Sequence, residues 1–121
     1  MTPYGSVVLE HFRRPRNHQR LDDATASAEG TNPLCGDRLR IELRVEEGMV
    51  REAAFTANAC AICTASASLL TTRVAGATLG DAGRISDADI VAWLETEVPP
   101  ARLACATLPL RTLRLALKSA S

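Results

Sequence analysis

The sequence predicts an α+β domain, because strand-like and helix-like hydrophobic patterns occupy different parts of the chain. Residues Leu39–Val45 alternate apolar and charged side chains without a break, which is typical of a strand with one buried face. A Glu-Glu-Gly turn at 46–48 leads into a second stretch, Met49–Ala57, and the two predict an antiparallel hairpin. Beyond residue 63 the apolar spacing takes the helical period. Strands followed by helices are the order expected of an α+β fold.

Two helices are predicted between the hairpin and the last cysteine. In Thr64–Ala75, three apolar residues share one helical face, and Gly76 suits a C-terminal cap. The segment Ser86–Asp89 resembles a capping box with Asp in place of Glu, and apolar residues at helical spacing follow it. Pro99-Pro100 is expected to end that second helix.

The remaining elements lie near the ends of the chain. Val7–Phe12 predicts one or two helical turns, and Ala26–Glu29 predicts a short strand. A last helix is predicted from leucines at helical spacing. Because Pro109 has no amide proton, it is expected in the first turn of that helix, which would then start no earlier than about Ala106.

The composition indicates one domain over residues 1–121 and argues against several classes of partner. Lys plus Arg and Asp plus Glu number 14 each, so no general attraction to nucleic acid or membrane is expected. No apolar run approaches the ~20 residues that span a bilayer, and Met1–Glu10 does not have the pattern of a signal peptide. We therefore expect a cytoplasmic protein, in which cysteines serve as metal ligands or reactive thiols more often than in disulfides.

Four cysteines carry the chemistry of the sequence. Cys35 precedes Gly-Asp in a turn-rich loop, so Asp37 can bring a hard oxygen beside the soft sulfur. Cys60 and Cys63 form a Cys-X-X-Cys pair between the second strand and the first long helix, and Cys105 follows a proline-rich turn. Positions near helix starts favour thiolate, the form that binds zinc and iron–sulfur clusters. The alternative is that these cysteines are small buried hydrophobic residues.

Several motifs together resemble the U-type iron–sulfur cluster scaffold family, which comprises the NifU N-terminal domain, IscU and SufU. The resemblance runs from about Val7 to Leu117. Its motifs agree in order and spacing: Pro15-Arg16-Asn17, Asn32-Pro33-Leu34-Cys35-Gly36-Asp37, Cys60 followed by Ala65-Ser66-Ala67-Ser68, and Pro99-Pro100-Ala101-Arg102 before Cys105.

The resemblance implies a three-stranded antiparallel sheet with helices packed on one face and a site at one exposed end. It implies that Cys35, Cys60 and Cys105 are cluster ligands or sulfur acceptors, with Cys105 a candidate persulfide acceptor. Asp37 matches the family's motif aspartate, which tunes cluster lability or serves as a ligand. The group held is then a transient [2Fe–2S] cluster or Zn²⁺.

Two functions follow from the resemblance. The leading hypothesis is a scaffold that takes sulfur from a cysteine desulfurase, builds a [2Fe–2S] cluster and passes it to acceptor apo-proteins. The alternative is a zinc-bound sulfur acceptor of the SufU kind, which is sulfurtransferase chemistry. Val98–Arg102 partly resembles a segment that an Hsp70-type chaperone recognises in the IscU branch, although a structural turn explains it equally well.

The sequence departs from the family pattern in three places. Ala104 stands where the IscU branch has a histidine before the last cysteine. The interval from Cys60 to Cys105 is shorter than SufU proteins have. Cys63 falls where relatives usually carry a residue that is not a ligand. Cys63 therefore has either a functional role close to the site in the first helical turn, as an alternative fourth ligand or an acceptor of persulfide from Cys60, or the role of a packing residue.

Overall fold

The computed structural model describes residues 5–120, so both ends of the predicted 1–121 domain and the first four residues of Met1–Glu10 lie outside it. In chain order its elements are α1 (Ser6–Arg13), β1 (Ala26–Asn32), β2 (Asp37–Glu46), β3 (Met49–Asn58), α2 (Ala61–Val74), α3 (Leu79–Gly83), α4 (Asp87–Leu94), the 3-10 turn η1 (Pro100–Arg102) and α5 (Leu103–Ala120).

The three strands form one antiparallel sheet in the order β1-β2-β3, which confirms the predicted α+β fold and the hairpin at its centre. Glu47 and Gly48 join β2 to β3 with φ of 54° and 74°. Positive φ at both turn residues gives a twist that matches the flanking strands. Strand β1 continues to Asn32, beyond the predicted Glu29, because residues 30–32 pair with the start of β2 although Gly30 and Asn32 are poor strand formers.

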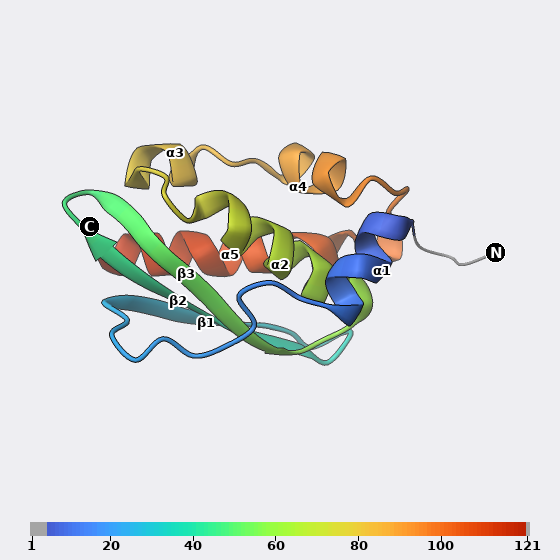
Figure 1. Cartoon of the computed structure of the whole chain (residues 1–121). Coiled ribbons are helices and arrows are strands. Elements are labelled where there is room, and N and C mark those ends of the chain that lie inside the picture. The colour runs from blue at the N-terminus through green and yellow to red at the C-terminus, as the bar shows by residue number, and fades with distance from the viewer. Residues whose placement is uncertain (1–4, 121) are drawn as a thin grey trace.

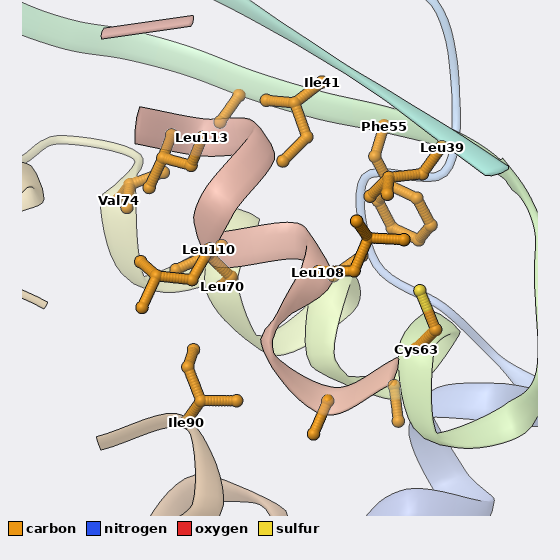
Figure 2. Packing of buried hydrophobic residues seen from close by; sticks show 14 of the residues in the cluster. Leu39, Ile41, Phe55, Cys63, Leu70, Val74, Ile90, Leu108, Leu110 and Leu113 are labelled. Atoms are coloured by element: carbon orange, nitrogen blue, oxygen red, sulfur yellow. The ribbon is translucent and has the colours of Figure 1, made fainter. Parts of the chain in front are cut away.

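Helices α2 and α5 lie on one face of the sheet, and α3 and α4 lie over them on the side away from the strands (Figure 1). Helix α5 contacts β1 and β2, and α2 contacts β3. The core lies between these layers, where Figure 2 shows side chains from sheet and helices meeting. Its largest fully buried members include Phe55, Ile41, Leu43, Leu70, Leu110 and Leu113. Each such side chain contributes about 1.5–3 kcal/mol through burial.

Several predicted helix boundaries were wrong, and local contacts explain why. Helix α2 begins at Ala61, one turn before Thr64, with Cys60 as its N-cap. The capping box of Ser86 and Asp89 is confirmed, but α4 ends at Leu94, well before Pro99, because Glu95 takes a left-handed conformation. The short helix α3 was not predicted, since two of its five residues are glycine. No helix within residues 5–120 is long and apolar enough to cross a membrane.

Helix α5 differs most from its prediction. It begins at Leu103 directly after η1, so Pro109 lies in the interior of the helix and not in its first turn. A proline there removes the amide that would bond to the carbonyl of Cys105. The buried hydroxyl of Ser66 donates to the neighbouring Ala106 carbonyl at 2.6 Å, and most of this part of α5 is buried. Packing and this hydrogen bond offset the local cost and place Cys105 in the first turn.

Gly30 allows β1 to approach α5 closely. A Cβ at residue 30 would stand 2.0 Å from Oγ1 of Thr112, whose hydroxyl donates to the Leu108 carbonyl. We expect Gly30→Ala to lower the free energy of unfolding by about 1–3 kcal/mol, the usual cost of overpacking. In a Thr112→Ala background, which removes Oγ1, the same change should cost less. Urea unfolding of the parent, the two single variants and the double variant tests this. An equal loss of stability from Gly30→Ala in both backgrounds would show that the close approach to Thr112 does not cause the destabilisation.

Candidate metal centre

The predicted site residues come from four separate parts of the chain that meet at one end of the molecule. Cys35 lies in the loop between β1 and β2, Asp37 begins β2, Cys60 is the N-cap of α2, and Cys105 lies in the first turn of α5. Antiparallel pairing of Asn32 with Asp37 closes the loop that carries Cys35. In Figure 1 these strand and helix ends lie at the end of the molecule where α1 packs. The fold therefore brings residues that are far apart in the sequence to the same end of the molecule.

The structure brings the donor atoms of this cluster close together. One donor atom from each of Cys35, Asp37 and Cys105 lies within 4.8 Å of the others. The Cys35 and Cys105 sulfurs are 3.2 Å apart. The Cys60 sulfur lies 3.8 Å from Oδ2 of Asp37. Two sulfurs and one carboxylate thus form the compact group, and the Cys60 sulfur lies beside it against Asp37. Thiolate and carboxylate donors of this kind suit zinc or an iron–sulfur cluster.

Asp37 also fixes the backbone of the site. Its Oδ1 accepts a hydrogen bond from the Cys60 amide at 2.9 Å, while Oδ2 faces the Cys60 sulfur. The Asp37 side chain is buried, with 2% of the residue exposed. One carboxylate therefore holds the start of α2 against the start of β2. It also contributes a negatively charged oxygen among the sulfurs.

The four site residues differ in exposure, which leaves the cluster open on one side. Cys35 is exposed and Cys60 is partly buried, whereas Cys105 and Asp37 are buried. Leu34 is 94% exposed beside Cys35. Gly36 has a φ of 71°, a conformation that favours glycine, so the loop can turn back at once into β2. A small molecule or a partner protein can reach the cluster from the side of this loop.

The expectation that helix starts favour thiolate was wrong for two of the cysteines. Burial, together with Cys35 and Asp37, raises the pKa of the Cys105 thiol. Burial, followed by the negative charge of Asp37, raises the pKa of the Cys63 thiol. Desolvation opposes the charged form of both groups and outweighs the helix dipole. These two thiols therefore keep their protons at neutral pH, and a bound cation would be needed to displace them.

Cys63 is the third residue of α2, but its side chain belongs to the hydrophobic core. It is fully buried, and Figure 2 shows it near Leu108 and Phe55. The core cluster includes Cys63 with Leu39 and Phe55. Of the two roles predicted for Cys63, this position favours packing over metal binding.

Asn32 lies next to the site, although its place in the motif of residues 32–37 did not predict a role for it. Its amide Nδ2 donates to the Cys105 sulfur at 3.7 Å, and its backbone carbonyl accepts from the Cys35 amide at 3.1 Å. Asn32 is buried, with 6% exposed. The signal available in the sequence was an asparagine directly before proline at a strand end, which commonly marks a turn. Asn32 therefore ties the Cys35 loop to Cys105.

The segment Val98–Arg102 lies between α4 and α5, next to the first turn that carries Cys105. Its residues Pro100–Arg102 form η1, and both prolines are exposed. The segment therefore forms a structural turn, which leads directly into α5. Ala104, the position of the missing histidine, is partly buried beside Cys105.

Comparison with known proteins places the chain in a family. The family model described as the NifU-like N terminal domain matches residues 3–120. An iron–sulfur cluster assembly scaffold protein IscU of Thermotoga maritima is 31% identical over 98% of this chain and 94% of its own length. A zinc-dependent sulfurtransferase SufU of Bacillus subtilis is also 31% identical, over 93% of this chain and 87% of its own length.

A solved structure shows the same fold. The crystal structure of a putative SUF-system scaffold protein from Fervidobacterium islandicum AW-1 superposes with a TM-score of 0.82, over 94% of this chain and 96% of that chain, at 21% identity. The extent of the family match and the identity to two full-length relatives agree with the resemblance drawn from the motifs. The chain belongs to the NifU-like N-terminal domain family, the family of the IscU, SufU and NifU proteins.

Proposed function

We propose that this protein is a single-domain iron–sulfur cluster assembly scaffold, in which Cys35, Asp37, Cys60 and Cys105 hold a [2Fe–2S] cluster as cargo. The observation that supports this most strongly is the grouping of Cys35, Asp37 and Cys105 at an open end of the fold, with the Cys60 sulfur 3.8 Å from Asp37. Relatives named as scaffolds match nearly the whole chain. Sulfur would come from a cysteine desulfurase, and acceptor apo-proteins would receive the cluster.

The residues of the site would divide this work between them. Cys60 and Cys105 lie at the starts of helices α2 and α5, which pack against the core, so their sulfurs would have fixed positions in the site. Cys35 stands on the exposed loop and would exchange ligands with incoming or outgoing partners. Asp37 supplies a hard oxygen, which matches iron–sulfur chemistry less well than thiolate does. Such a mixed site can build a cluster and still release it.

In this proposal Cys105 is also a candidate acceptor of sulfane sulfur. Its thiol would lose its proton as the sulfur attacks the terminal sulfur of a desulfurase persulfide, forming the Cys105 persulfide and releasing the desulfurase thiolate. Cys105 is fully buried, whereas the Cys35 sulfur lies 3.2 Å away in front of it. The donor would therefore reach Cys105 only after a local movement that exposes its sulfur. Without such a movement, the exposed Cys35 thiol would be the first acceptor of the sulfur.

A second candidate function is a zinc-bound sulfur acceptor that activates a cysteine desulfurase. The donor set supports it, because zinc binds both thiolate and carboxylate ligands in four-coordinate sites. The relative described as a zinc-dependent sulfurtransferase matches this chain as well as the scaffold relative does. Here the same four residues would hold Zn²⁺, and one thiolate would leave the metal to accept the sulfur.

The partners of either function would use surfaces beside the site. A desulfurase would dock around Cys35 and the exposed Leu34. We also propose that the Val98–Arg102 segment, exposed at residues 99–101, offers a docking point for an Hsp70-type chaperone, since it adjoins the helix turn that carries Cys105.

One experiment tests the proposed function and separates the two candidates. The protein is purified without oxygen and supplied with a cysteine desulfurase, cysteine and Fe²⁺. A scaffold should become coloured and hold about two iron and two sulfide ions per chain, and it should then transfer them to an apo-ferredoxin. A zinc acceptor should stay colourless, retain about one Zn²⁺ and increase desulfurase turnover. If the protein neither forms a cluster nor stimulates the desulfurase in a zinc-dependent way, both functions are contradicted.

A further inference from the structure

The sulfurs of Cys35 and Cys105 lie in close contact at the site. They are 3.2 Å apart, closer than two sulfur atoms in ordinary contact, and both thiols are free. A disulfide needs about 2.05 Å between sulfurs, so bond formation requires a movement of only about 1 Å. The two thiols also differ in access, because Cys35 is exposed and Cys105 is fully buried.

We propose that Cys35 and Cys105 form a reversible disulfide when the metal-free protein meets a small disulfide oxidant. Exposed Cys35 is the attacking thiol and buried Cys105 the resolving thiol. Redox-sensitive cysteines are typically accessible and stand next to a resolving cysteine, which is the arrangement found here.

The reaction with oxidised glutathione balances in two exchange steps. The Cys35 thiolate attacks one sulfur of oxidised glutathione, forms a mixed disulfide and releases one glutathione thiolate. The Cys105 thiol then loses its proton as its sulfur attacks the Cys35 sulfur, forms the Cys35–Cys105 bond and releases the second glutathione thiolate. The two protein thiols give up two protons and two electrons, and one oxidised glutathione becomes two reduced glutathione molecules.

The local structure favours this pair over the other thiols. The Cys35 loop has open space beside Gly36, because apart from its chain neighbours no described heavy atom lies within 4 Å of where a Cβ on Gly36 would stand. Cys60 is held at the start of α2 by the hydrogen bond from its amide to Asp37, with a carboxylate oxygen 3.8 Å from its sulfur. Cys63 is fully buried in the core. Neither has both the access and the freedom of Cys35.

The disulfide would compete directly with loading of the site. It consumes two of the four residues assigned to metal or cluster binding in the proposed function. A bound metal would in turn occupy both sulfurs and block the exchange. The bond itself forms in the metal-free protein and does not depend on the proposed function, whereas protection by metal does.

Trypsin places the relevant cysteines on separate peptides, which makes the pairing measurable. Cleavage after Arg20 and Arg38 isolates Cys35, cleavage after Arg102 and Arg111 isolates Cys105, and residues 52–73 carry both remaining cysteines. Metal-free protein is treated with oxidised glutathione, its free thiols are alkylated, and the digest is analysed by mass spectrometry without reductant. We expect peptide 21–38 linked to peptide 103–111 as the main product, and its loss on reduction.

Serine variants of the individual cysteines serve as controls, and a parallel experiment adds zinc before the oxidant. Cys60→Ser and Cys63→Ser should keep the linked product, whereas Cys35→Ser should lose it. A main link between peptides 52–73 and 103–111, or glutathione stably attached to peptide 21–38, would overturn the proposal. Equimolar Zn²⁺ added before the oxidant should slow linkage at least about tenfold. If linkage forms and zinc gives no protection, the disulfide stands and metal binding by this pair fails.

Discussion

Serine in place of Cys60 should remove metal from the protein, while serine in place of Cys63 should leave metal bound. The Cys60 sulfur faces the Asp37 carboxylate at 3.8 Å within the donor cluster. A serine hydroxyl is harder than thiolate and keeps its proton at neutral pH, so it is a poor replacement ligand. We expect Cys60→Ser to weaken zinc binding by at least about 100-fold, more than the 10–100-fold typical for loss of an outer partner. Cluster yield should fall in parallel.

Cys63→Ser should change stability and not metal content. Its sulfur lies in the apolar core and is fully buried. A buried hydroxyl that lacks a hydrogen-bond partner costs about 1–3 kcal/mol, so the free energy of unfolding should fall by roughly that amount. Cys63→Ala, which removes the polar atom, should cost less than Cys63→Ser if the core can close around the smaller side chain.

The comparison needs two measurements on each variant. Zinc affinity is obtained by competition with a chromogenic chelator, and stability by urea unfolding of the metal-free protein, so that bound metal does not add to it. Cys60→Ser should lose affinity with a smaller change in stability, and Cys63→Ser the reverse. Loss of zinc by Cys63→Ser at unchanged stability would make Cys63 a ligand.

The strands and the grouping of the candidate site residues were predictable from sequence because their signals are local or are carried by short motifs. Alternation in Leu39–Val45 and the Glu47-Gly48 turn specify the central hairpin without reference to other parts of the chain. The Cys35-Gly36-Asp37 spacing likewise brings a sulfur and a carboxylate to one turn. That Cys105 meets them follows from the family motifs. No pattern within a single segment predicts that meeting.

The errors arose where tertiary contacts outweigh local propensity. Pro109 argues against a helix starting at Leu103, but the buried surface of α5 and the Ser66 hydroxyl offset the lost hydrogen bond. Helix dipoles argue for thiolates at Cys63 and Cys105, but the depth of burial depends on packing that the sequence does not display. The contact between Asn32 and Cys105 is likewise visible only after β1 packs on α5.

Removing the charge of Asp37 should lengthen the life of a bound cluster. The carboxylate is buried 3.8 Å from the Cys60 sulfur, where it repels a ligating thiolate. It is also the harder and weaker partner for iron among the four donors. We expect Asp37→Asn to slow cluster transfer to an apo-ferredoxin about tenfold, a factor that corresponds to about 1.4 kcal/mol.

The choice of substitution separates charge from structure in this test. In the Asp37→Asn variant the side-chain amide oxygen can still accept the hydrogen bond from the Cys60 backbone amide, so α2 should stay in place. Asp37→Ala loses that acceptor as well, and leaving a buried amide unpaired costs about 1–3 kcal/mol of stability. Slow transfer shared by both variants, with lost stability in Asp37→Ala alone, assigns lability to the charge.

The same pair of variants distinguishes cluster from zinc. Zinc readily accepts a carboxylate oxygen at about 2.0–2.2 Å, so Asp37→Asn should weaken zinc binding even though it prolongs cluster life. Transfer is followed by the spectrum of the ferredoxin, and zinc affinity by chelator competition. A cluster lost faster from Asp37→Asn than from the parent protein would make Asp37 a stabilising ligand and would end its assignment as the labile element of the site.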